Sequence, residues 1–111
     1  MEAGARTPEE LETLLEDAFV LRDPRALGRL FQPGAMLVAG GGLPDARGHQ
    51  QITRLATRLW RLDRSYLADP RRILQVGDTA LVLGGHATNV VCRTGDGSWR
   101  YSIAFLQGGS R

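Results

Sequence analysis

With 111 residues, the chain is long enough for one hydrophobic core and too short for two domains. Hydrophobic residues make up 42% of it and charged residues 23%, which excludes a disordered or low-complexity protein. All 14 basic residues are arginine, but the net charge is only +2 and the arginines are scattered among acids, so we expect no nucleic-acid partner.

The same sequence limits the setting in which the chain works. Cys92 is the only cysteine, which rules out an internal disulfide and a cysteine-based zinc site and fits a reducing cytoplasm. No segment approaches the roughly 18 apolar residues of a membrane span, and we expect no membrane partner. We predict a single domain over residues 7–107, with flexible ends at 1–6 and 108–111.

The first third of the chain predicts two helices. Thr7 can cap the first helix, with Pro8 at its first position and Glu10 reaching back toward the cap. An apolar stripe at helical spacing follows: Leu11, Leu14, Leu15, Ala18 and Phe19. Asp23 caps a second, short helix, which we expect to extend through Phe31 and to end at Pro33-Gly34.

The middle of the chain predicts a strand, a loop and a helix. A short buried strand is expected over Ala35 to Ala39, and the three glycines that follow it predict a flexible loop at the mouth of a pocket. The helix after Arg47-Gly48-His49 places its apolar side chains on one side. These are Ile52, Leu55, Ala56, Leu59 and Trp60.

The last part of the chain predicts strands. Residues 65–76 read as mostly extended, and two further strands are expected over Thr79 to Leu83 and His86 to Arg93. Gly84-Gly85 between them is either a two-residue hairpin or a kink within one long strand. In the final strand, four large side chains alternate with small or polar ones. The large ones are Trp99, Tyr101, Ile103 and Phe105.

Three segments together carry a resemblance to a known family: Asp23-Pro24-x-Ala26-Leu27-x-x-Leu30-Phe31, Arg47-Gly48-x-x-x-Ile52 and Asp96-Gly97-Ser98-Trp99-Arg100-Tyr101. In their order and spacing, the chain resembles the nuclear-transport-factor-2-like superfamily, and most of all its SnoaL-like and ketosteroid-isomerase-like branch. The resemblance implies an α+β cone, in which a curved, mixed and mostly antiparallel sheet wraps around the N-terminal helices. It also implies an apolar pocket inside the cone and, in many relatives, a homodimer through the sheet.

The chain departs from that family where the chemistry of its isomerases resides. The resemblance places an aspartate at the position of Ala39, an oxyanion-holding tyrosine at the position of Leu15, and an aspartate at the position of Ala104. Proton abstraction beside a carbonyl needs a base and a donor for the developing oxyanion, and these three residues supply neither. We therefore expect no steroid isomerisation by the family's usual residues.

The best candidate for acid–base chemistry is His86, because imidazole titrates near neutral pH. If residues 94–97 form a four-residue loop, His86 and Thr88 share a face with Tyr101 and Trp99, although a one-residue bulge would reverse the faces. Tyr66 and Tyr101 are candidate hydrogen-bond donors to a ligand. The remaining residues expected to line the pocket are Leu15, Phe19, Met36, Val38, Trp60, Thr88 and Trp99.

Two functions stay open from the sequence. One is a cofactor-independent and metal-independent cyclase, dehydratase or isomerase acting on a small apolar or polyketide-like ligand, with His86 as acid–base. The other is a non-catalytic, dimeric ligand-binding or assembly module that has lost the family's carboxylates.

Overall fold

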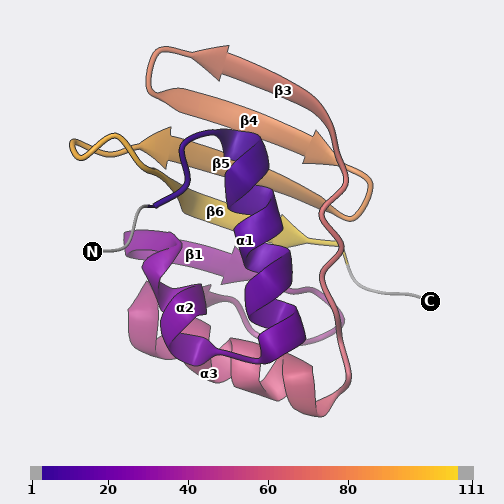
Figure 1. The fold of residues 1–111 in the computed structure, drawn as a ribbon. Coiled ribbons are helices and arrows are strands. Elements are labelled where there is room, and N and C mark those ends of the chain that lie inside the picture. The colour runs from indigo at the N-terminus through magenta and orange to yellow at the C-terminus, as the bar shows by residue number, and fades with distance from the viewer. Residues whose placement is uncertain (1–3, 108–111) are drawn as a thin grey trace.

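The computed structural model describes residues 4–107, in which three helices pack against a six-stranded sheet (Figure 1). The elements in chain order are α1 (Pro8–Leu21), α2 (Pro24–Arg29), β1 (Phe31–Val38), β2 (Ala46–Arg47), α3 (Gly48–Arg61), β3 (Pro70–Val76), β4 (Thr79–Gly84), β5 (Ala87–Arg93) and β6 (Trp99–Leu106). The strand order is β2-β1-β6-β5-β4-β3, and only β1 and β6 run parallel. The predicted α+β architecture with a mixed, mostly antiparallel sheet is confirmed.

Helix α1 begins as its sequence predicts. Thr7 is the N-cap, and its hydroxyl accepts a hydrogen bond from the Glu10 amide at 3.0 Å. Glu10 in turn accepts from the Arg6 amide at 2.7 Å, so the start of the helix is fixed from both sides. The predicted apolar stripe faces the core, but it also contains a buried acid, Glu12.

The segment after α1 differs from the prediction. Asp23 caps α2 as expected, but the helix ends at Arg29, and β1 already starts at Phe31. Pro33 and Gly34 lie within β1 at an irregular stretch, where Gly34 takes a φ of 76°. Proline and a left-handed glycine can break the pairing of a strand locally as well as end a helix, so Pro33-Gly34 marks a bulge here.

Helix α3 follows the prediction closely. Gly48 adopts a φ of 84°, which a side chain would disfavour, at the point where the short strand β2 turns into the helix. The five predicted apolar residues of α3 are all buried. This helix packs beside β1 and β2 at one end of the sheet, while α1 crosses in front of the strands (Figure 1).

Gly84-Gly85 belongs to a hairpin. Strands β4 and β5 run antiparallel, with Leu83 opposite Thr88, so the chain reverses over the residues between them. The Gly85 amide donates to the Asp69 carbonyl at 3.1 Å, which ties this turn to the segment that leads into β3. The alternative of one kinked strand is excluded.

A bulge in β6 decides which side chains face the helices. Tyr101 pairs with Val91 and Ile103 with Val90, so Ser102 is an extra residue between them. Trp99 and Tyr101 therefore face inward, as do Ala104 and Leu106 beyond the bulge, whereas Ile103 and Phe105 point outward. The expectation that all four large residues of this strand share one face is wrong, and the reversal that a bulge would cause is what the structure shows.

The packed part of the chain includes residues just before α1. Ala5 is buried, pairs with Trp99, and accepts a hydrogen bond from its amide at 2.9 Å. Of the predicted flexible ends at 1–6 and 108–111, residues 1–3 and 108–111 lie outside the described residues. No helix between residues 4 and 107 combines the length and apolarity needed to cross a bilayer.

Candidate functional site

The interior of the molecule holds a polar cluster centred on Glu12, which is only 2% exposed. The Glu12 carboxyl accepts hydrogen bonds from the Tyr66 hydroxyl at 2.5 Å, the Tyr101 hydroxyl at 2.6 Å and the Asn89 side-chain amide at 2.8 Å. These partners come from the segment after α3, from β6 and from β5. The cluster therefore joins α1 to the inner face of the sheet.

Burial changes the acidity of both tyrosines in this cluster. Removal from water raises the pKa of Tyr66 and of Tyr101 well above the ordinary value of 10.0, and the nearby Glu12 carboxyl raises both further. Both hydroxyls therefore stay protonated and act as hydrogen-bond donors across the physiological pH range. Tyr101 is completely buried, so its hydroxyl has no open path to a ligand.

Asn89 links this cluster to the backbone of β6. Its side-chain amide donates to Glu12, while its side-chain carbonyl accepts from the Phe105 amide at 3.1 Å. This second bond satisfies a backbone N–H group of the neighbouring strand. Asn89 therefore connects α1 to β6 through its two side-chain bonds.

A pocket of about 200 Å³ opens at the end of the molecule where α1 and α3 finish. Its apolar lining residues are Phe19, Leu59, Leu67 and Leu106, and its polar ones are Arg64, Ser65, Tyr66, His86 and Gln107. His86 lies in the hairpin between β4 and β5 and is exposed at the rim. Arg64 donates to the carbonyl of the buried Ala39 at 3.3 Å, which holds its guanidinium on the inner side.

The structure brings together only part of the predicted site. Phe19, Tyr66 and His86 line the pocket, and Trp60 packs edge-on against Phe19 behind it, with ring centroids 5.8 Å apart. Tyr101 lies deeper in the interior, where its hydroxyl donates to Oε2 of Glu12, while the Tyr66 hydroxyl donates to Oε1.

The other predicted lining residues lie elsewhere. Leu15 is part of the closed core, and Trp99 lies beside Ala5, with the Arg93 guanidinium 5.3 Å from its ring centre. Met36 and Val38 lie on the outer face of β1, because they pair with the outward residues Ile103 and Phe105. Thr88 lies on that outer face as well, opposite Phe105.

Sequence reasoning missed the two residues that organise the interior. Glu12 occupies a core position in the apolar stripe of α1, one residue after Leu11 and three before Leu15, which is the signal that could have revealed it. Asn89 follows Thr88, which we expected to face the pocket; the bulge in β6 reverses that expectation, so that Asn89 is the residue that faces inward. Among residues 4–107, no three His, Cys, Asp or Glu side chains lie close enough to hold a metal ion.

Comparison with known proteins gives a consistent answer at the level of the fold. No family model and no curated protein matches the sequence. A Thiobacillus denitrificans structure described as a calcium/calmodulin-dependent protein kinase type II association domain superposes with a TM-score of 0.78 at 16% identity, covering 98% of this chain and 100% of that one. A ketosteroid isomerase-like protein from Erwinia carotovora gives 0.75 at 17% identity, covering 93% and 94% of the two chains.

The description of a third similar structure includes the name of the fold. This structure, from Streptomyces avermitilis, is described as a dehydratase of the NTF2-like family and superposes with a TM-score of 0.68 at 20% identity over 91% of this chain and 93% of that one. The chain has the nuclear-transport-factor-2-like fold. Identities this low establish the fold alone, and proteins of this fold carry out unrelated tasks, so the site has to decide the function.

Within this nuclear-transport-factor-2-like fold, the position of the expected pocket is largely filled. Leu15, Ala39 and Ala104 are all buried, and the space between α1 and the sheet is occupied by Glu12 and its three partners. What remains open is the small pocket at the rim, where Tyr66 contributes its ring and His86 its imidazole.

Proposed function

We propose that this chain is a non-catalytic module that self-associates through the outer face of its sheet. The observation that carries the proposal is an apolar surface without a covering helix. Two rows of side chains cross four or five strands on this face, as the strand registers place them: Met36, Ile103, Val90, Leu81 and Leu74, and next to them Val38, Phe105, Thr88 and Leu83. We call this surface the outer sheet face.

Several members of the outer sheet face are open to solvent. Ile103 is 40% exposed and Phe105 is 49% exposed, in the middle of the sheet rather than at an edge. Monomeric proteins seldom expose continuous apolar patches of this kind, and two such faces can pack against each other at about 10 Å. A second copy of the chain would cover the outer sheet face by a two-fold axis, because the same patch then serves both partners.

The interior supports a role without catalysis. The Glu12 carboxyl already accepts three hydrogen bonds from buried donors, so it is engaged in holding the fold. The open pocket, at about 200 Å³, is smaller than the roughly 300 Å³ at which ligand sites usually begin. The fold also suits assembly, since one of the similar structures is described as an association domain.

Measuring the mass of the purified chain by light scattering during size-exclusion chromatography tests this proposal. We expect a dimer for the wild type and a monomer for Phe105→Asp, since a charge at the centre of the outer sheet face would be buried without a partner. Val20→Asp is the matched control: Val20 is exposed on α1, and this variant should remain dimeric. A wild type that stays monomeric at high concentration contradicts the proposal.

A second candidate function rests on one specific observation: Tyr66 and His86 line the same pocket. An imidazole at the rim and aromatic and aliphatic walls suit proton transfer on a small apolar ligand, as in a cyclase, dehydratase or isomerase. A thermal-shift screen of such compounds, repeated with His86→Ala, tests this candidate. The enzyme hypothesis needs a compound that raises the melting temperature of both proteins and is converted only by the wild type.

A further inference from the structure

Helix α3 presents a row of arginines without a single acidic residue in the helix. Arg54, Arg58 and Arg61 are spaced by four and three residues, so they lie on one exposed side of α3. Like charges at this spacing repel each other and weaken a helix slightly. The sequence contains no acid between Asp45 and Asp63 that could relieve this repulsion along the chain.

The arginines of α3 differ in this respect from arginines elsewhere in the protein. Arg71, Arg93 and Arg100 each form an ion pair with an aspartate on their own hairpin or nearby segment, at 3.0, 2.7 and 3.5 Å. Within residues 4–107, no carboxylate forms such a pair with Arg54, Arg58 or Arg61. The three arginines therefore have no ion-pair partner among the described residues, although Asp45 lines a neighbouring hollow together with Arg54 and Arg58.

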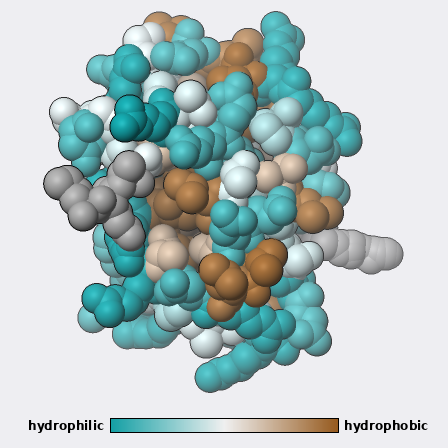
Figure 2. Space-filling model, in the orientation of Figure 1, coloured by the Kyte–Doolittle hydropathy of each residue, from teal (hydrophilic) through white to brown (hydrophobic). Residues whose placement is uncertain are grey.

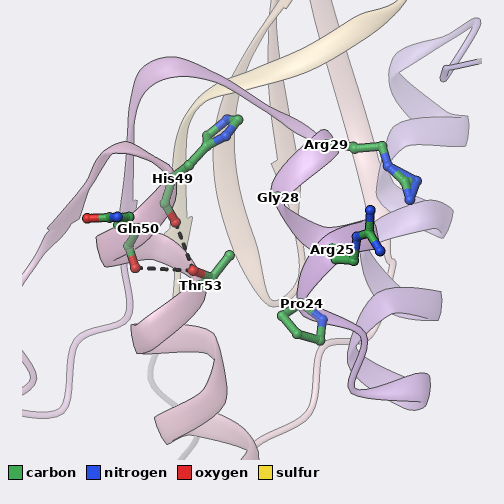
Figure 3. A pocket seen from close by; sticks show the side chains of 7 residues that line it. All are labelled: Pro24, Arg25, Gly28, Arg29, His49, Gln50 and Thr53. Carbon is green, nitrogen blue, oxygen red and sulfur yellow. Dashed lines mark hydrogen bonds between the residues drawn. The ribbon is translucent and has the colours of Figure 1, made fainter.

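This basic side borders a groove between α2 and α3. One hollow of about 730 Å³ is lined by Pro24, Thr53, Thr57, Leu62 and the three arginines, and an adjoining hollow of about 480 Å³ shares Pro24 and Thr53 with it. Figure 3 shows the second hollow, with Pro24 and Gly28 on the α2 side facing Thr53 on the α3 side. We call the two hollows together the α2–α3 groove.

The floor of the α2–α3 groove is apolar, although its rim is charged. The Thr53 hydroxyl donates to the His49 and Gln50 carbonyls within α3, and the Thr57 hydroxyl donates to the Thr53 carbonyl. The Thr53 methyl group lies toward Gly28 of α2, because a Cβ added there would meet it at 3.7 Å. Leu62, 57% exposed, closes the end of the groove beside Arg58 and Arg61.

We propose that the α2–α3 groove binds an acidic, amphipathic peptide segment of a partner protein. Acidic side chains of that segment pair with Arg54, Arg58 and Arg61, and its apolar side chains lie on the floor formed by the threonine methyl groups, Pro24 and Leu62. An amphipathic helix in a groove uses these two kinds of contact together. The proposal is independent of self-association, since the groove and the outer sheet face are separate surfaces.

The groove favours a peptide over a nucleic acid. Its described lining residues include no Phe, Tyr or Trp, so bases would find no ring to stack on. Phosphate contacts also do not require an apolar floor, whereas a peptide with leucines does. The basic rim favours acidic side chains and the apolar floor favours apolar ones. Together they favour an acidic, amphipathic peptide segment over a nucleic acid.

The test uses a short, fluorescently labelled peptide of Glu and Leu with its leucines at helical spacing, titrated with the full chain by anisotropy. We expect binding that weakens with salt, and that becomes at least about fivefold weaker in Arg54→Glu/Arg58→Glu, because two exposed ion pairs are lost. Arg71→Glu/Arg72→Glu is the matched control: it makes the same change of charge on β3, at the opposite end of the sheet. This control should bind as tightly as the wild type within about twofold.

Two comparisons separate the alternatives. A peptide in which serine replaces every leucine keeps the charge but should bind more weakly, since it leaves the apolar floor uncovered. Equal binding by both peptides, equal loss in both double variants, or tighter binding of a single-stranded oligonucleotide of the same charge would each overturn the proposal. Melting temperatures of the variants within a few degrees of the wild type show that the surface, and not the fold, has changed.

Discussion

At the scale of single residues, Glu12 has a role that its position within a hydrophobic stripe does not suggest. It satisfies three buried donors at once, and each donor in turn keeps its carboxyl satisfied. Tyr101→Phe removes one donor without changing the packing of the ring. We expect a loss of about 1–3 kcal/mol in the free energy of unfolding, measured by urea denaturation.

A double-mutant cycle measures the coupling between Tyr101 and Glu12 directly. Because Tyr101 and Glu12 are in direct contact, the effects of Tyr101→Phe and Glu12→Gln should deviate from additivity by about 0.5–3 kcal/mol. Additive effects would show that the hydrogen bond between them contributes nothing to stability.

The raised pKa values of the two tyrosines predict how stability depends on alkaline pH. A hydroxyl whose pKa is higher in the folded than in the unfolded state stabilises the fold fully below its ordinary pKa of 10.0. That contribution is lost as the pH rises above this value, since the unfolded chain then ionises more easily. In denaturation series between pH 8 and 12, the unfolding free energy of the wild type should fall more steeply with pH than that of Tyr66→Phe/Tyr101→Phe.

The carboxyl group of Asp96 should give the opposite dependence of stability on pH, in the acid range. Hydrogen bonds from Thr94 and from Ser98 lower the pKa of its carboxyl below the ordinary value of 3.8. A lowered pKa stabilises the fold above pH 3.8, and this contribution disappears as the pH falls further. The difference in unfolding free energy between wild type and Asp96→Ala should therefore shrink below about pH 4, and a difference that is constant with pH would contradict this role of the loop.

At the scale of elements, the hairpin between β4 and β5 depends on the absence of side chains. A Cβ at Gly84 would lie 3.0 Å from the Asp69 carbonyl oxygen and 3.2 Å from that of Ala87, both of them backbone atoms with little room to move. We expect Gly84→Ala to destabilise the fold by about 1–2 kcal/mol. Gly95→Ala is the matched control, because a Cβ there meets nothing within 4 Å, and its melting temperature should stay close to that of the wild type.

Elements whose signals are local were predictable from the sequence. The caps and the helical spacing of α1 and α3 lie within each segment, so both helices and their buried faces follow from nearby residues. The bulge in β6 has no such signal. It arises because Ser102 has no partner opposite it in either β1 or β5, which only the pairing of three distant segments determines. That one residue moved Met36, Val38 and Thr88 out of the expected site and moved Asn89 into the interior.

The candidate site was predictable to the same limited extent. Tyr66 and His86 were identified by their chemistry, and they do line one pocket. Glu12 was visible as an acid on an apolar helix face, but its partners come from residues 54 to 89 positions away. Such long-range contacts leave no trace in local spacing.

At the scale of the whole molecule, the two faces of the sheet are unequally protected. The helices and the polar cluster cover the inner face, while the outer sheet face has no helix from residues 4–107 over it. A second apolar area lies at the end of α1, where Val20 and Leu21 are both 72% exposed. Figure 2 shows hydrophobic surface on the α1 side of the molecule. If two copies join through the outer sheet face, association is coupled to folding. The melting temperature of the wild type should then rise with protein concentration, whereas that of Phe105→Asp should not change.

The position of Glu12 also constrains when this domain can fold during its synthesis on the ribosome. Helix α1 emerges first, but the donors for its buried carboxyl arrive with Tyr66, Asn89 and finally Tyr101. Strand β1 likewise pairs in parallel with β6, which is synthesised after the other strands of this sheet. A nascent chain that stops before Trp99 would hold an acid in an apolar helix face without all of its donors, so this domain can reach its native state only after β6 has been synthesised.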